Sequence, residues 1–158
     1  MKRLIISGSP RARGRSAGVA EAVRFAFEES CADDDVQLVS LADVRISPCT
    51  GCETCADTLG RNELYCIISD DMLRVREMLN ACDQLTVVSP VYFAGAPSQL
   101  KAFLDRLQPY FWSDARADAK RPAVLHVVGE GGEHILTRDD VRAFAKAGAD
   151  IILLPAPG

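Results

Sequence analysis

An arginine- and serine-rich loop follows the first apolar run of the chain. The segment SGSPRARGRS spans residues 7–16 and holds three arginines, three serines and two glycines. At the start of a helix, free backbone N–H groups and the helix dipole favour an anion. Hydroxyl and guanidinium groups can add hydrogen bonds to phosphate oxygens. The side chains able to do so are Ser9, Ser16, Arg11, Arg13 and Arg15. The loop therefore predicts a phosphate-binding site, and a polar loop that merely caps the helix is the alternative.

The loop does not match the common nucleotide-binding motifs. A Walker loop reads G-x-x-x-x-G-K-[ST], whereas Gly8 and Gly14 enclose one residue too many and Arg15 replaces the lysine. The apolar run at 84–89 ends without an acidic residue for magnesium. The dinucleotide fingerprint G-x-G-x-x-G is also absent. These observations argue against a nucleotide hydrolase.

A second loop, SPVYFAG at 89–95, is suited to a flavin ring. A flat ring needs apolar walls and backbone hydrogen bonds, which a loop containing proline, glycine and aromatic residues can supply. Tyr92 and Phe93 lie in this loop, and simple packing of both rings is the alternative. The neighbouring phosphate loop favours the flavin. The glycines of GEGG at 129–132 are weaker support, because they can approach a ring or only turn the chain.

Four cysteines lie in an irregular region of the sequence. Cys49, Cys52 and Cys55 follow the spacing C-x2-C-x2-C, and Cys66 is the natural fourth ligand of one metal centre. A [4Fe–4S] cluster and free thiols are the two leading interpretations, ahead of zinc or a redox disulfide. The remaining Cys31 and Cys82 are expected to be structural.

Apolar runs alternate with helical patterns along the chain. The predicted strands are residues 3–7, 36–41, 84–89, 123–128 and 150–155. The predicted helices run from a cap at Ser16 to about Ser30, from a cap at Ser69 through Leu79, from Pro97 through Leu107, and from 137 to Gly148. This alternation predicts an α/β fold with a parallel sheet covered on both faces. In such sheets, ligands bind beyond the carboxyl ends of the strands.

Length and composition predict a single domain, residues 1–158, of an ordinary globular protein. The net charge of −4 argues against a nucleic-acid partner. The first apolar run stops too early for a signal peptide, and no run approaches the length of a membrane span. We therefore expect a cytoplasmic protein that does not bind membranes.

Four segments together resemble the NADPH-dependent FMN reductase family, and more narrowly its iron–sulfur flavoprotein branch and cluster-free relatives. They are GSPRARGRS, CTGCETC, SDDM and SPVYFAGAPSQLKAFLDR. The resemblance implies a three-layer flavodoxin-like fold with a five-stranded parallel sheet in the order 2-1-3-4-5. It implies that FMN is the cofactor and that a second subunit, in a homodimer or homotetramer, covers the flavin. Ten residues separate Cys55 from Cys66, a longer spacing than the one between the third and fourth cysteines of iron–sulfur flavoproteins. The four cysteines could therefore be free thiols in place of cluster ligands.

The resemblance also implies particular binding residues. The FMN phosphate is expected at Ser9, Arg11 and Ser16, with Arg13 in the same loop. The ring is expected along Pro90, Val91, Tyr92, Phe93 and Gly95, with Gly129 beside it. No acid–base side chain is nominated, because the flavin carries the chemistry.

Three functions follow as hypotheses. In the first, FMN accepts a hydride from NAD(P)H and reduces a flavin, a quinone or another small acceptor. In the second, an iron–sulfur flavoprotein exchanges electrons with a ferredoxin-type protein. In the third, the loop binds another phosphate compound without redox chemistry.

Overall fold

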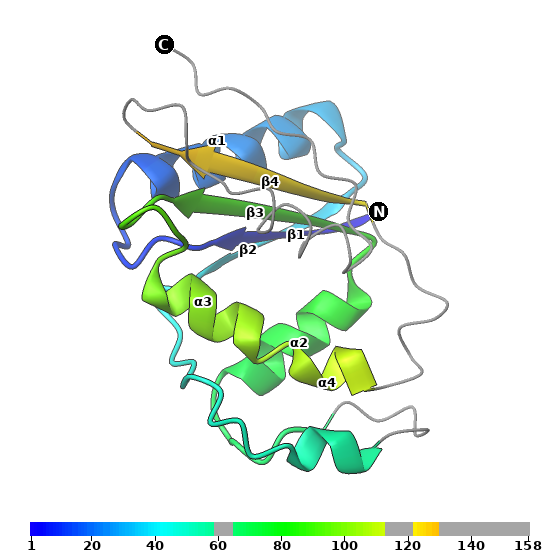
Figure 1. Cartoon of the computed structure of the whole chain (residues 1–158). Coiled ribbons are helices and arrows are strands. Elements are labelled where there is room, and N and C mark those ends of the chain that lie inside the picture. Colours follow the sequence, from blue (N-terminus) through cyan, green and yellow to red (C-terminus); the bar gives the residue numbers. More distant parts are fainter. Residues whose placement is uncertain (59–64, 113–121, 130–158) are drawn as a thin grey trace.

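Parallel strands form the sheet at the centre of the described structure (Figure 1). The computed structural model describes residues 1–58, 65–112 and 122–129. Its strands are β1 (Lys2–Ser7), β2 (Asp35–Ser40), β3 (Gln84–Pro90) and β4 (Ala123–Val128). They pair in parallel in the order β2-β1-β3-β4, which confirms the predicted order for these strands. The strand predicted at 150–155 and the helix predicted at 137–148 lie outside the described residues.

Strand β1 is buried on both faces because its alternate side chains enter two separate cores. Leu4 and Ile6 belong to the larger core, together with Phe103. Ile5 points to the opposite face and joins the smaller core with Ala20. A strand covered on both sides needs a continuous apolar run, which explains the unbroken run at its centre.

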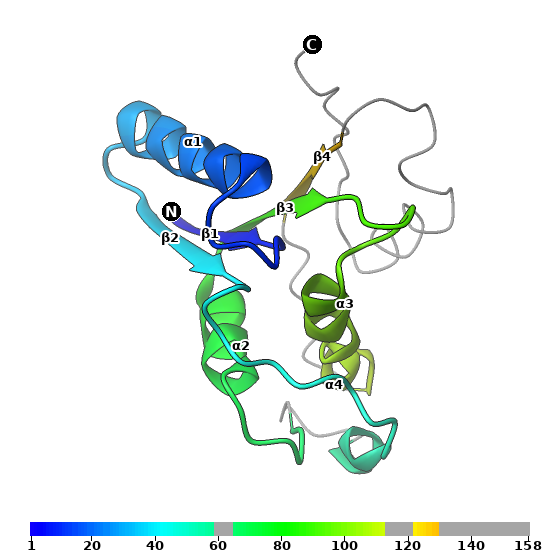
Figure 2. The same cartoon turned by 90° about the vertical axis from the view of Figure 1, so that its left-hand side faces the viewer.

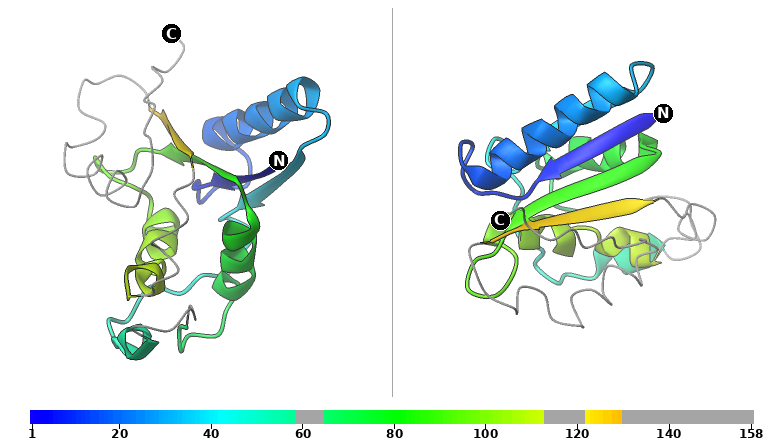
Figure 3. Two further views of the ribbon diagram at one scale, coloured as in Figure 1. Left: turned by 90° about the vertical axis from the view of Figure 1, so that its right-hand side faces the viewer. Right: turned by 90° about the horizontal axis from the view of Figure 1, so that it is seen from above.

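Helices cover both faces of this sheet (Figures 2 and 3). They are α1 (Arg15–Ser30), α2 (Met72–Ala81), α3 (Ser98–Asp105) and α4 (Gln108–Trp112), with a short 3-10 helix η1 (Thr54–Thr58). Helix α1 lies on one face, whereas α2 and α3 lie on the other, and η1 lies beyond that second helical layer. Among the described residues, no helix has the length and apolar character needed to cross a bilayer.

The apolar stripe predicted for α1 is confirmed, and its members pack against the smaller core: Val19, Val23 and Phe27. The predicted cap at Ser16 is wrong, because α1 begins one residue earlier, at Arg15. Gly14 occupies the N-cap in an extended conformation and offers no side chain to the first N–H groups. Ser16 is instead buried within the first turn.

The predicted cap at Ser69 is also wrong. Asp71 occupies the N-cap of α2 and makes no side-chain capping bond. The carboxylate of Asp70 accepts a hydrogen bond from the backbone N–H of Met72 at 3.0 Å instead. The two aspartates therefore precede the helix and do not form its first turn.

Helix α3 is shorter than predicted at both ends. Pro97 is its N-cap and not its first residue, and the helix ends at Asp105. Leu107 lies between α3 and α4. Pro109 explains the break, because a proline has no N–H to donate and its ring clashes with the carbonyl four residues earlier.

Candidate functional site

Two loops that sequence reasoning assigned to a flavin site meet at one edge of the sheet, the phosphate loop (residues 7–16) and the ring loop (residues 89–95), with Gly129 close by. Strands β1, β3 and β4 are neighbours and run in the same direction, so their carboxyl ends lie side by side. The backbone N–H of Gly8, just after β1, donates to the carbonyl of Val88 in β3 at 2.7 Å. Pro90 pairs with Val128, which places Gly129 next to the ring loop. The structure therefore brings the predicted phosphate and ring loops together (Figure 1).

The start of α1 is open to an anion. No side chain caps its first turn, and that turn contains no acidic residue that would repel a phosphate. Ser9 and Ser16 are only 4% and 5% exposed, so both are packed within the loop and the first turn of α1. The hydroxyl of Ser9 accepts a hydrogen bond from the backbone N–H of Arg11 at 3.1 Å, which folds the loop back on itself. These features fit the phosphate of FMN.

A close contact requires glycine at position 8. A Cβ atom there would lie 2.8 Å from Cδ2 of Leu100, a side chain that is 1% exposed. Since the core holds Leu100 firmly, only glycine lets the loop leave β1 at this point. Helix α3 therefore packs directly beneath the phosphate loop.

The ring loop contains a strained turn. Tyr92 and Gly95 exchange two backbone hydrogen bonds, of 3.0 and 3.1 Å. Between them, Phe93 and Ala94 both have positive φ, at 48° and 59°. Non-glycine residues rarely adopt this conformation, and such strain clusters at ligand-binding sites. Phe93 is fully exposed and Tyr92 is 39% exposed, so neither ring belongs to the core of the described residues.

The segment that holds Cys49, Cys52, Cys55 and Cys66, here called the cysteine loop, lies apart from this edge, around η1 and beyond the layer of α2 and α3 (Figure 2). Cys49 and Cys52 are exposed, whereas Cys55 and Cys66 are half-buried. Burial raises the pKa of the Cys55 thiol, and the charges of the other three thiols add to the effect. Hydrogen bonds from Thr54 lower the pKa of Cys52. Among residues 1–58, 65–112 and 122–129, no three His, Cys, Asp or Glu side chains are arranged to hold a metal ion.

The other two cysteines behave as predicted. Cys82 ends α2, is buried in the larger core, and donates its thiol hydrogen to the carbonyl of Leu79 at 3.2 Å. Cys31 caps the end of α1 and is half-buried. Both residues therefore lie at the ends of helices, and Cys82 also packs in the core.

A buried ion pair anchors both ends of the cysteine loop, and the sequence reasoning missed it. The side chains of Arg106 and Asp70 are 1% and 4% exposed, and their charged groups lie 2.8 Å apart. Arg106 also donates to the carbonyls of Ser47 and Ile68, at 2.9 and 3.1 Å. Asp70 accepts a hydrogen bond from the backbone N–H of Ser47 at 2.8 Å. Since Arg106 caps the end of α3, that helix connects the ring loop to the cysteine loop.

Stability at acid pH should depend on Asp70. Burial acts to raise the pKa of this carboxyl, but hydrogen bonds from Arg106 and from backbone N–H groups outweigh burial and leave the pKa lowered. A lowered folded-state pKa stabilises the protein above the ordinary value of 3.8, and this contribution is lost as the pH falls through the folded-state pKa. Urea unfolding below about pH 4 should therefore show a declining midpoint.

The variant Asp70→Asn tests this dependence. It should be less stable at neutral pH and show a flatter decline in acid, because the titrating group is gone. Asp33→Asn, an exposed control in the turn before β2, should keep the wild-type decline. If the urea midpoints of wild type and Asp70→Asn fall equally with pH, Asp70 does not cause the loss of stability in acid.

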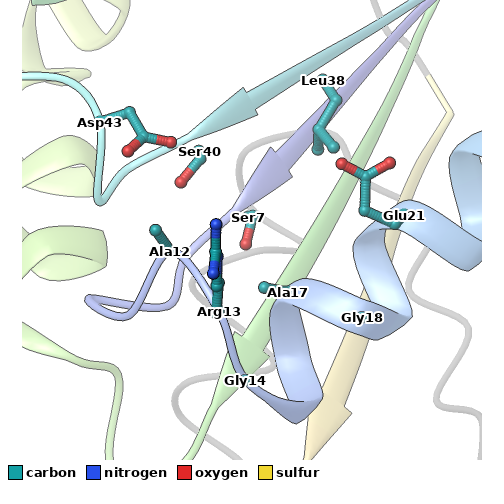
Figure 4. Close-up of a pocket in the computed structure, with 10 residues that line it drawn as sticks. All are labelled: Ser7, Ala12, Arg13, Gly14, Ala17, Gly18, Glu21, Leu38, Ser40 and Asp43. Carbon is teal, nitrogen blue, oxygen red and sulfur yellow. The ribbon is translucent and has the colours of Figure 1, made fainter.

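A cavity of about 320 Å³ lies on the β2 side of the phosphate loop (Figure 4). Its walls come from the end of β1, the phosphate loop, α1, β2 and the turn after β2: Ser7, Ala12, Arg13, Gly14, Ala17, Gly18, Glu21, Leu38, Ser40 and Asp43. Of the residues predicted to bind FMN, only Arg13 lines it. Sequence reasoning missed this cavity, because residues from two strands and a helix form it.

Comparison with known proteins places the chain among flavoproteins. A family model described as NADPH-dependent FMN reductase matches residues 1–152. An iron–sulfur flavoprotein of Methanocaldococcus jannaschii is 37% identical over 110 residues, which are 69% of this chain and 53% of that protein. One of Methanosarcina thermophila is 35% identical over 108 residues, 67% of this chain and 52% of that protein. The chain thus spans about half the length of these relatives.

Solved structures share the fold at low sequence identity. A NAD(P)H:quinone oxidoreductase from Methanothermobacter marburgensis has a TM-score of 0.69 and 16% identity, covering 98% of this chain and 86% of that one. A FMN-dependent NADH-azoreductase from Bacillus anthracis, in complex with FMN, has a TM-score of 0.64 and 14% identity, covering 97% of this chain and 86% of that one. These likenesses confirm the predicted α/β fold class.

Proposed function

This chain belongs to the NADPH-dependent FMN reductase family, and from that premise we propose that it is an FMN-dependent oxidoreductase. One observation carries the proposal. The start of α1 has no side-chain cap and no acidic residue in its first turn, and it lies at the same sheet edge as the strained ring loop. One loop offers donors to a phosphate, and the other offers apolar surface to a ring. FMN has both groups.

The proposed roles follow from the positions of the loops. Ser9, Arg11 and Ser16 hold the phosphate with the first N–H groups of α1, and Arg13 adds positive charge. The ring lies along β3's carboxyl end, against Pro90, Val91, Tyr92, Phe93 and Gly95, with Gly129 adjacent. When bound, FMN supplies hydride acceptance and electron transfer, and the protein binds it, orients it and limits water access. No side chain is assigned an acid–base step.

The proposed reaction uses NAD(P)H as the reductant and a flavin, a quinone or another small molecule as the acceptor. The quinone oxidoreductase and the azoreductase that share the fold support acceptors of this class. We further propose a cytoplasmic homodimer or homotetramer in which a neighbouring subunit covers the flavin. The fully exposed ring of Phe93, beside the proposed flavin, supports such a contact.

Anaerobic mixing with NADH or NADPH tests the reaction. Protein loaded with FMN should lose its oxidised-flavin absorbance much faster than the same concentration of free FMN, because the site orients both reactants. Adding a quinone should then restore the oxidised spectrum. Bound FMN that is reduced no faster than free FMN would contradict the reductase.

An iron–sulfur electron carrier is the second candidate. The charges of the other three thiols, which add to burial in raising the pKa of Cys55, and the iron–sulfur relatives support it. In that case Cys49, Cys52, Cys55 and Cys66 would hold the cluster, and a ferredoxin-type protein would be the partner. The described residues do not present these thiols as a ligand set, so they do not fit a cluster in this arrangement. The reductase is therefore the preferred proposal.

A further inference from the structure

The cavity beside the phosphate loop continues the proposed flavin site in one direction along the sheet edge. The ring loop follows β3, the phosphate loop follows β1, and the cavity lies between α1 and the end of β2. Since the strand order is β2-β1-β3, ring site, phosphate site and cavity form a line. A ligand that extends beyond the FMN phosphate, away from the ring, would enter the cavity.

A buried hydroxyl in the cavity wall indicates that a ligand belongs there. Ser7 is 3% exposed and lines the cavity, yet its Oγ has no hydrogen-bond partner among the described residues. Ser40 is its direct neighbour on β2, so both side chains lie on the face of the sheet that α1 covers. An orphaned buried hydroxyl is costly, and a polar ligand would satisfy it.

The charged groups of the cavity suit a sugar linked to a phosphate. Figure 4 shows Arg13 directed between the loop and the end of β1, with Asp43 after β2 and Glu21 on α1. The carboxylate of Glu21 pairs with Arg24 at 2.8 Å, which leaves Asp43 as the acceptor. A guanidinium pairs with a phosphate, and a carboxylate accepts hydrogen bonds from the hydroxyls of a ribose. The helical wall carries small side chains, and a Cβ atom at Gly18 would meet nothing within 4 Å. This wall leaves room for a flat base.

We propose that the cavity takes the adenosine 5′-phosphate half of FAD, so that this site accepts FAD as well as FMN. The inference rests on the proposed function, because it starts from the FMN phosphate at α1. Arg13 binds the second phosphate, and Asp43 accepts from the ribose hydroxyls. The same adenosine phosphate is also part of NAD(P)H. FAD is the occupant that the linear order of the sites favours, because its adenosine is joined through the phosphate itself.

Flavin affinity of the apoprotein tests the proposal. Binding of FMN and FAD is measured by quenching of flavin fluorescence, for wild type and for Gly18→Leu and Asp43→Asn. Gly18→Leu fills the cavity from the helical wall, and Asp43→Asn removes the charged acceptor while preserving the volume. Gly18→Ala and the exposed Asp33→Asn are the matched controls. Michaelis constants for NADH and NADPH are measured on the FMN-loaded forms.

The proposal expects wild type to bind FAD within about tenfold of FMN. Asp43→Asn should weaken FAD at least about tenfold, the effect of one weakened hydrogen bond to a charged group. Gly18→Leu should weaken FAD at least as much by occupying the space of the base, and both variants should leave FMN unchanged. It is overturned if FAD does not bind, if both variants leave its affinity intact, or if they raise only the NADH or NADPH constant. If any of these results occurs while FMN still binds normally, the proposal for FAD is wrong and the proposed function is unaffected. If the protein binds neither FMN nor FAD, the proposed function is wrong as well.

Discussion

Replacing Arg106 with leucine is expected to lower the free energy of unfolding by about 3–5 kcal/mol. The substitution leaves the carboxylate of Asp70, which is 4% exposed, without its charged partner. It also removes the donors that hold the carbonyls of Ser47 and Ile68, one on each side of the cysteine loop. Urea unfolding followed by circular dichroism measures the loss.

Two further variants identify the cause of that loss. The double variant, in which leucine replaces both Arg106 and Asp70, should be more stable than Arg106→Leu alone, because no buried charge is left unpaired. Lys101→Met breaks an exposed ion pair with Asp105 on the same helix and should cost no more than about 0.5 kcal/mol. If Arg106→Leu costs as little as Lys101→Met, the buried pair does not anchor the loop.

Replacing Arg11 with alanine is expected to weaken FMN binding by about 1.5–3 kcal/mol, the contribution of a hydrogen bond to a charged group. That change corresponds to a roughly ten- to hundredfold higher dissociation constant. Arg11 lies in the loop that Ser9 folds back toward the start of α1, where no acidic side chain competes for the anion. Fluorescence titration with FMN measures the change.

Riboflavin, which has no phosphate, is the matched ligand for this experiment. Its affinity should be the same for wild type and for Arg11→Ala, because only the phosphate contact is removed. Arg74→Ala, an exposed arginine of α2, should leave both affinities unchanged. Equal weakening of FMN and riboflavin would show that Arg11 supports the loop and does not bind the phosphate.

Local sequence patterns predicted the elements that position the site. The apolar runs at β1, β3 and β4 and the stripe on α1 depend on the period of strands and helices, and the structure confirms them. Because neighbouring parallel strands end at the same edge of a sheet, the loops that follow them meet there, and this position could be predicted from the strand pattern alone. The predicted helix ends were less accurate, because Gly14, Asp70 and Pro109 override the usual capping signals.

Contacts between distant segments could not be predicted in this way. Arg106 and Asp70 are 36 residues apart, and only the packed structure shows that they share a buried position. The cavity likewise requires the pairing of Ser7 with Ser40 and the approach of α1 to β2. Asp70 lies just before α2, whereas its partner Arg106 is the C-cap of α3. Periodicity carries no information on such pairs.

The absorption spectrum of anaerobically purified protein, taken after incubation with FMN and removal of unbound flavin, tests FMN binding directly. Iron and acid-labile sulfide are assayed on the same sample. We predict oxidised-flavin bands at close to one FMN per chain, without iron or sulfide. Matching iron and sulfide with a broad, bleachable absorbance would replace the reductase with the iron–sulfur carrier. A colourless protein that does not retain added FMN would contradict both and leave the loop to another phosphate ligand.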